Sequence, residues 1–297
     1  MEKNLKIIPT VSTKNIPYNI MMLAILLLPS CNQKLKETMK APDAKQEPCR
    51  LSAHNDIRID PYYWMKDRKD PAVKAYLEAE NHYTDHVLKP TKALQEELYR
   101  EITNRIVRDE ETVPYHKNGY WYFTKYQGDS EYPLYCRKRS FEEQKYAVFL
   151  NINTMAEGYT YYDDSYFYIS PDNNIVAFGE DTISRRLYDI RFKDISSEEM
   201  LFDVIPGTTG SVAWASDNKT VFYTLKDPVT LRAYKVMSHQ LGDDVKNDKI
   251  IFEEQDETFD VNVYNSKSGR FIIISSNSTL TSEVRILESS NPWGNFL

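Results

Sequence analysis

Two stretches of this chain repeat one pattern, and the pattern decides the fold. Residues 166–178 read YFYISPDNNIVAF, and residues 211–223, which lie 45 positions later, read SVAWASDNKTVFY. Each stretch has an apolar segment, a polar turn containing Asp-Asn and a second apolar segment, which is typical of a β-hairpin. The pattern recurs at 261–274, where it turns at Ser268-Gly269, and more weakly at 113–123, where it turns at Asn118-Gly119.

The spacing of these hairpins predicts a β-propeller. A period of about 45–55 residues suits a blade of four strands. Further strands that alternate polar and apolar residues are expected at 133–139, 186–192, 231–237 and 283–287. Short outer strands are expected at 147–150, 199–204 and 248–253. We therefore predict a mainly β protein with blades starting near residues 113, 166, 212 and 261.

The number of blades predicts that the propeller is incomplete. The fourth repeat has no outer strand in the sequence, so residues 111–297 hold about three and a half blades. Each blade of a propeller covers the apolar face of the next, and an open array leaves one face and its strand edges uncovered. We expect the sequence to be a truncated form of a larger ring.

The composition is that of a folded, acidic, β-rich protein. The 297 residues are 41% hydrophobic and 13% aromatic, which excludes global disorder. Tyrosine is abundant, with 22 residues, and glycine is scarce, with 9. The formal net charge of −7 argues against nucleic acid as a partner, because nucleic-acid binding needs a basic surface.

The first 31 residues have the pattern of an export signal. Three lysines precede an apolar run at 20–28, which is too short to span a bilayer but suits the core of a signal peptide. The run ends in Ser30-Cys31, which resembles the cleavage site of a bacterial lipoprotein. We expect Cys31 to be lipidated and the protein to be exported, as a periplasmic or membrane-anchored lipoprotein. A plain signal peptide or a buried apolar segment are the alternatives.

Residues 32–50 are rich in Lys, Glu, Pro and Gln, and we predict a flexible tether there. Besides Cys31 the chain has only Cys49 and Cys136, which do not make a disulfide framework. They could pair in an oxidising compartment, but two free thiols are the favoured interpretation.

Residues 51–110 predict a helical segment. Asp70-Pro71 is a helix start, with Asp as the N-cap and Pro at the first helical position. A second helix follows the interruption at Lys89-Pro90. Its apolar stripe is Leu94, Leu98, Ile102 and Ile106. Two adjacent helices before a β array predict a packed helical hairpin.

The chain lacks the motifs of several enzyme classes. No two of its nine glycines lie four positions apart, which excludes a Gly-x-Ser-x-Gly nucleophile elbow. The glycine positions also exclude a P-loop and a dinucleotide fingerprint, so no cofactor is predicted. His82 and His86 have the i, i+4 spacing of metal ligands, but Tyr83 stands where a zinc peptidase motif has Glu. A polar helix face is the better interpretation.

Other candidate residues are better explained by structure. Asp163-Asp164 and Glu253-Glu254 could share a proton if confined, but we expect them in or near solvated turns. Arg185-Arg186 could hold the carboxylate of a peptide or of another domain, although a structural role in the propeller is preferred. Three aromatic residues are expected in the blade core: Trp121, Trp214 and Tyr223.

Several blocks in order carry a family resemblance. They are the segment from His54 to WMKD at 64–67, DP at 70–71 with YLEAEN at 76–81, EYPLYCR at 131–137, DTISRR at 181–186, IRF at 190–192, WASDNKT at 214–220 and KDPVTLR at 226–232. From about residue 52 to its end the chain resembles the N-terminal part of the prolyl oligopeptidase family of serine peptidases, and within it the oligopeptidase B (protease II) group.

The resemblance implies a seven-bladed propeller above a C-terminal α/β-hydrolase domain. Such enzymes cut short peptides with a Ser-Asp-His triad, oligopeptidase B-like members cut after Lys or Arg, and the propeller restricts access. The N-terminal helices wrap onto the catalytic domain. In that family the triad lies mostly beyond the propeller, in residues that this sequence does not contain. We therefore predict no catalytic, cofactor or metal residues here, and no peptidase activity for the chain alone.

Three hypotheses on function follow. In the first, the chain is the N-terminal portion of an exported, lipid-anchored serine endopeptidase, and short peptides reach a hydrolase domain through its gated cavity. In the second, it is a protein-binding module anchored to a membrane by Cys31. In the third, it is an inactive truncated remnant.

Overall fold

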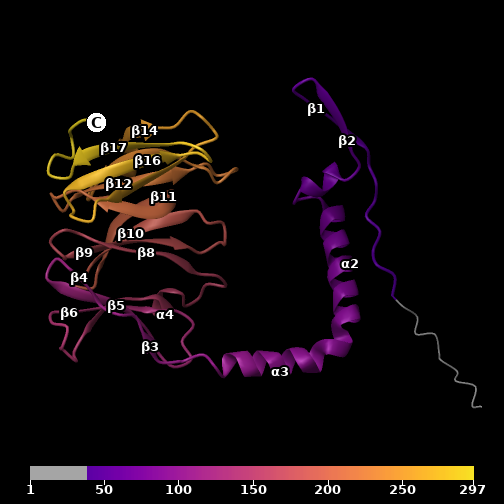
Figure 1. The fold of residues 1–297 in the computed structure, drawn as a ribbon, viewed down its shortest axis with the longest axis horizontal. Helices are drawn as coiled ribbons and strands as arrows, with labels where there is room; N and C mark the ends of the chain where they lie inside the picture. The colour runs from indigo at the N-terminus through magenta and orange to yellow at the C-terminus, as the bar shows by residue number, and fades with distance from the viewer. Residues whose placement is uncertain (1–38) are drawn as a thin grey trace, which may run out of the picture. The chain divides into compact units, whose positions relative to one another are not determined.

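The computed structural model in Figure 1 describes residues 39–297. The predicted signal peptide, with Cys31, lies outside the described residues. The described residues divide into two compact units, with the boundary between Arg105 and Ile106. No helix in the described range is long and apolar enough to cross a membrane.

The first unit contains a hairpin that the sequence did not predict. Strands β1 (Cys49–Ala53) and β2 (Asp56–Asp60) pair antiparallel around a turn in which His54 and Asn55 have φ of 49° and 62°. The indole Nε1 of Trp64 donates to the Lys45 carbonyl at 2.9 Å. The flexible tether predicted for 32–50 is therefore wrong at its end, because backbone pairing and this indole hold residues 45–50 in place.

Two helices follow this hairpin. Helix α2 (Pro71–Leu88) begins where the sequence predicts, and Asp70 accepts the N–H of Ala72 at 2.8 Å as its N-cap. A short 3-10 turn (Lys89–Thr91) connects it to α3 (Lys92–Thr103).

The packed hairpin expected from the sequence does not form between these helices. Val73 is the only buried residue of α2, and α3 has none. The apolar stripe is open, with Leu94 54% exposed and Ile102 61% exposed. Leu88, Lys89, Thr91 and Lys92 all keep helical backbone angles. Pro90 therefore bends the chain without reversing it, and the helices run in different directions in Figure 1.

The second unit is an array of antiparallel sheets that lie face to face (Figure 1). The first sheet contains β3 (Glu110–Glu111), β4 (Tyr115–Lys117), β5 (Tyr120–Tyr126), β6 (Leu134–Lys138) and β7 (Ala147–Asn151), and the short helix α4 (Ile152–Met155) follows it. The second sheet contains β8 (Asp163–Ile169), β9 (Ile175–Asp181), β10 (Tyr188–Asp194), β11 (Met200–Trp214), β12 (Thr220–Lys226), β13 (Ala233–Gln240) and β14 (Lys249–Glu253). The third contains β15 (Asp260–Asn265), β16 (Phe271–Asn277) and β17 (Ser282–Glu288).

Strand β11 belongs to two blades. Its first part pairs with β10, as Ile190 opposite Ile205 shows, and completes the second blade. Its last part pairs with β12, as Val212 opposite Tyr223 shows, and begins the third blade. The sequence predicts two separate strands here, whereas the structure has one strand of 15 residues. Gly207 and Gly210, with φ of 72° and 82°, let this strand bend from one blade to the next.

Apolar side chains fill the spaces between neighbouring sheets. Aromatic residues dominate between the first and second blades, where Phe149 and Phe167 meet edge to face with centroids 4.9 Å apart. Trp214 and Tyr223 are buried in the next cluster, which confirms the prediction for both. Trp121 is only half-buried, because it lies on the outer face of the first sheet and contacts Phe141 instead.

The last residues of the chain occupy the place of an outer strand in the fourth blade. Leu297 and Ile286 exchange two backbone hydrogen bonds of 3.0 Å each along the edge of β17. Phe296 lies 5.9 Å from Phe222 in a T-shaped contact, which anchors the segment on the third blade. The described sheets thus make three blades of four strands or more and a fourth blade of three strands with this edge contact.

A serine hydroxyl joins the inner strands of the second and third blades. Ser165 Oγ donates to the Gly210 carbonyl and accepts the N–H of Gly179, each at 2.9 Å. A Cβ on Gly179 would lie 2.7 Å from the Gly210 Cα, and a Cβ on Gly210 would overlap with Ser165. The two backbones therefore approach as closely as they do only because both residues lack a side chain.

We predict that Gly210→Ala lowers the free energy of unfolding by about 2–4 kcal/mol, because it adds a steric clash to the strain of a positive φ. Gly269→Ala is the matched control, since Gly269 has φ of 73° but no atom within 4 Å of an added Cβ. We expect the control to lose only about 1 kcal/mol in urea denaturation. Equal losses in both variants would contradict the close approach at Ser165.

Candidate functional site

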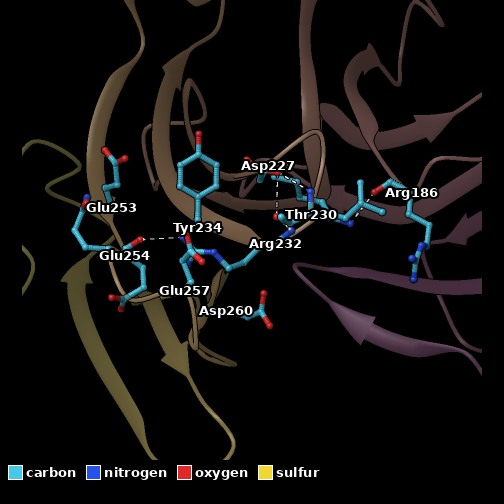
Figure 2. Close-up of a pocket in the computed structure, with 12 residues that line it drawn as sticks. Arg186, Asp227, Thr230, Arg232, Tyr234, Glu253, Glu254, Glu257 and Asp260 are labelled. Carbon is cyan, nitrogen blue, oxygen red and sulfur yellow. Dashed lines mark hydrogen bonds between the residues drawn. The ribbon is translucent and has the colours of Figure 1, made fainter. Parts of the chain in front are cut away.

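A cavity of about 710 Å³ opens where three connections of the second unit meet. Arg186 contributes from the β9–β10 loop, five residues between 226 and 232 from the end of β12 and the loop that follows it, Tyr234 from β13, and five residues between 253 and 260 from the β14–β15 connection. Figure 2 shows Glu253 and Glu254 on one side of this cavity and Arg186 on the opposite side. The lining is polar, with three cationic and five acidic side chains.

A buried carboxylate holds the β9–β10 loop. Asp181 accepts the N–H of Ile183 at 2.9 Å and the N–H groups of Arg185 and Arg186 at 2.8 and 2.6 Å. These bonds stabilise a loop in which Ser184 and Arg186 both have positive φ. The backbone of the Ser-Arg-Arg block is therefore structural, as preferred from the sequence.

A similar turn forms the second wall. Asp227 Oδ1 accepts the N–H groups of Val229 and Thr230 at 2.9 and 2.6 Å. The Thr230 bond is the main cause that holds the pKa of Asp227 below its ordinary value. Leu231 leaves the turn with φ of 65°. This arrangement explains the KDPVTLR block: Asp caps a turn that returns the chain to β13.

Arg232 fixes the third wall. Its guanidinium donates to the carbonyls of Asp256 at 3.1 Å, Phe259 at 2.9 Å and Glu254 at 3.3 Å. Glu254 is also held, since it accepts the Ser276 hydroxyl at 2.6 Å, which is the main cause that lowers its pKa. Glu253 pairs with Lys235 at 3.2 Å. The connection between the third and fourth blades is therefore rigid.

Three charged side chains of the cavity have no hydrogen-bond partner among the described residues: Arg186, Glu257 and Asp260. These side chains are available to bind a ligand. Arg186 can pair with a carboxylate of the ligand, and the two acids can pair with a cationic group of the ligand. The lining contains neither histidine nor cysteine. Its hydroxyl side chains are Tyr234 and Thr230, and the Thr230 hydroxyl donates to Asp227. The unpaired charges of the lining are suited to binding a charged ligand.

The structure separates the other sequence candidates from this cavity. His82 and His86 are exposed on α2, and no group of potential metal ligands is found in residues 39–297. Cys49 and Cys136 are both free thiols, as favoured, and burial raises the pKa of Cys136 to about 11.

The interpretation of Asp163-Asp164 as residues of a solvated turn is wrong. Both lie on β8 and are half-buried, because the strand begins earlier than the apolar pattern indicates. Asp163 accepts the Tyr188 hydroxyl at 2.6 Å, and Asp164 accepts the Tyr135 hydroxyl at 2.5 Å. Burial raises the pKa of Asp164 above its ordinary value. These tyrosines hold the two carboxylates apart, so they form no acid–base pair.

Sequence reasoning missed one buried charge cluster. His239 on β13 lies between two carboxylates, with Nδ1 2.7 Å from Asp248 and Nε2 3.0 Å from Asp203. All three side chains are buried, and Asp248 also accepts the Tyr223 hydroxyl at 2.7 Å. No local motif indicates the cluster, because Asp203 is 36 residues from His239 and comes from the preceding blade.

We predict that this cluster makes stability depend on pH. Burial alone lowers the pKa of His239, but Asp248 and Asp203 outweigh it, so the pKa lies above 6.5. An imidazolium favoured by folding stabilises fully below the unfolded pKa near 6.5 and loses its effect as pH rises through the folded pKa. The unfolding free energy of the natural chain relative to His239→Gln should therefore fall between pH 6 and 9, by up to about 1.4 kcal/mol per unit.

Urea denaturation at several pH values measures this difference. His86→Gln is the control, because His86 is exposed on α2 and its replacement should leave the profile unchanged. A difference between the natural chain and His239→Gln that stays constant or widens towards pH 9 would argue against a stabilising imidazolium.

Comparison with known proteins identifies the class of this fold. A family model described as the N-terminal β-propeller domain of prolyl oligopeptidase matches residues 42–297. The solved structure of oligopeptidase B from Leishmania major superposes with a TM-score of 0.80 at 30% identity, covering 86% of this chain and 38% of that one. The chain therefore belongs to the prolyl oligopeptidase family, as the resemblance of its sequence blocks indicated, and corresponds to the N-terminal propeller.

Two curated relatives give the same result. Dipeptidyl aminopeptidase BI of Pseudoxanthomonas mexicana is 33% identical over 295 residues, which cover 93% of this chain and 41% of the relative. Protease 2 of Moraxella lacunata is 33% identical over 261 residues, which cover 86% of this chain and 38% of the relative. The chain spans about two fifths of the length of these relatives.

Proposed function

We propose that this chain is the propeller portion of an exported, oligopeptidase B-like serine endopeptidase and controls the access of short peptides to a hydrolase domain. The observation that carries the proposal is the family match over residues 42–297, together with a cavity built for binding. Hydrolysis after Lys or Arg is the activity proposed for the assembled enzyme. The free carboxylates of Glu257 and Asp260 support it, because they would attract the basic side chain of such a peptide.

The exposed apolar stripe on α3 supports the proposal that another domain packs against the N-terminal helices. Leu94, Leu98 and Ile102 lie on one face at helical spacing, and each is about half exposed or more. Such a stripe is stable only when another element covers it. We propose that the hydrolase domain covers these side chains.

Sequencing the DNA on the 3′ side of this coding region tests the proposal. We expect an α/β-hydrolase sequence with Gly-x-Ser-x-Gly, in frame or after a frameshift. Its absence would count heavily against the proposal. The purified chain should not cleave a Lys- or Arg-directed reporter peptide, and inhibitor-sensitive turnover by this chain alone would contradict its assignment as a propeller without a catalytic site.

In the chain joined to that hydrolase, we predict that Glu257→Gln with Asp260→Asn lowers kcat/KM for Arg-containing peptides by about three- to tenfold. Loss of two attracting charges weakens capture of a cation, and the effect should shrink at high salt. Glu198→Gln is the control, because Glu198 is exposed in the β10–β11 turn and does not line the cavity. Equal effects on Arg-containing and neutral peptides would argue against electrostatic capture.

We also propose export and anchoring through Cys31. The apolar run at 20–28 followed by Ser30-Cys31 supports this proposal. We predict that cells fed radiolabelled palmitate label the natural chain, and that Cys31→Ser abolishes the label and releases the protein from the membrane fraction. Cys49→Ser is the control and should keep both properties. Labelling that persists in Cys31→Ser would exclude this anchor.

A further inference from the structure

The first blade carries a second cavity, of about 310 Å³, where β5 begins and β6 ends. Its charged lining residues are Arg137, Lys138, Arg139, Lys145 and Glu143. None of these residues lines the larger cavity between the later blades. The cavity therefore lies apart from the proposed peptide site.

The charges around this cavity are unbalanced. None of its four cationic side chains forms an ion pair within residues 39–297. Its one carboxylate is held by the backbone, since Glu143 Oε2 accepts the N–H groups of Arg139 at 3.0 Å and Ser140 at 3.3 Å, and it offsets only one of the four positive charges. A strongly positive cavity thus exists on a chain whose formal net charge is −7.

Aromatic stacking orients the two guanidinium groups. Arg137 Cζ lies 4.4 Å and Arg139 Cζ 4.0 Å from the centroid of the Tyr120 ring. Arg137 also donates through Nη1 to the carbonyl of Asn173 at 2.7 Å, which fixes its position. A stacked guanidinium keeps its N–H edge free for an oxyanion and loses less entropy on binding than a mobile side chain.

We propose that this cavity binds a phosphate-bearing anion. A phosphate group carries up to two charges and several acceptor oxygens, so it can pair with more than one cationic side chain at once. A single carboxylate would leave most of the positive charge unbalanced. The volume lies at the lower end of the range for small-ligand sites, which suits one phosphate group and a short substituent.

Titration calorimetry of the full chain with sodium pyrophosphate, at fixed ionic strength, tests the proposal. The double variant Arg139→Gln with Lys145→Gln should bind pyrophosphate at least tenfold more weakly. Both side chains are exposed, so circular dichroism should show an unchanged fold. Lys267→Gln removes one exposed charge on the fourth blade and should change the affinity less than twofold. The single variant Arg139→Lys keeps the charge but loses the planar guanidinium that stacks on Tyr120. Its affinity for pyrophosphate should lie between those of the other two variants.

Equal affinity of the natural chain and the double variant would overturn the proposal, as would pyrophosphate binding no tighter than acetate binding. Vesicles of phosphatidylglycerol, with phosphatidylcholine as the reference, identify the source of the phosphate. Vesicle binding that pyrophosphate displaces assigns the site to a lipid headgroup. Pyrophosphate binding without vesicle binding assigns it to a soluble phosphate ligand.

Discussion

The structure depends on the burial of each sheet between its neighbours. A twisted antiparallel sheet with apolar faces is not stable alone, so each blade is stabilised by the neighbouring blade that covers its apolar face. Strand β11 makes this stacking continuous, because it ends one blade and begins the next without a loop. The close approach at Ser165, Gly179 and Gly210 then sets how tightly the inner strands lie. The cavity at the ends of these blades exists because this stacking brings their loops together.

The same requirement explains the surfaces at the two ends of the array. On the fourth blade, Val284 is 55% exposed and Tyr264 44% exposed on the face that turns away from the third blade. On the first blade, Phe141 and Val148 are exposed in the same way. The chain matches about two fifths of the length of its curated relatives.

The β9–β10 and β12–β13 loops, which line the larger cavity, are folded by the same local arrangement. An aspartate at the end of the second strand of a blade, Asp181 or Asp227, accepts backbone N–H groups and folds the following residues into a tight turn. With the backbone held by these bonds, the side chain of Arg186 remains available to a ligand. The residues of the family blocks at 181–186 and 226–232 therefore hold the shape of the cavity wall. In the first-blade cavity, by contrast, an aromatic ring positions the charged groups, since Arg137 and Arg139 stack on Tyr120.

The sequence alone determined the hairpins of the four blades, the start of α2 and the family, because each is carried by short motifs of residues close together in the chain. A turn of Asp-Asn between two apolar segments is decided by local backbone preference. The joining of two predicted strands into β11, the buried His239 between Asp203 and Asp248, and the direction of α3 depended on the tertiary structure. Each of these features arises from contacts between distant segments or from the bend at Pro90. An alternation of apolar residues does not indicate which strand of another blade will supply a charged side chain. The hairpin motif at 166–178 thus specified the blade, and the packing of blade against blade determined which of its residues face a neighbour and which face a ligand.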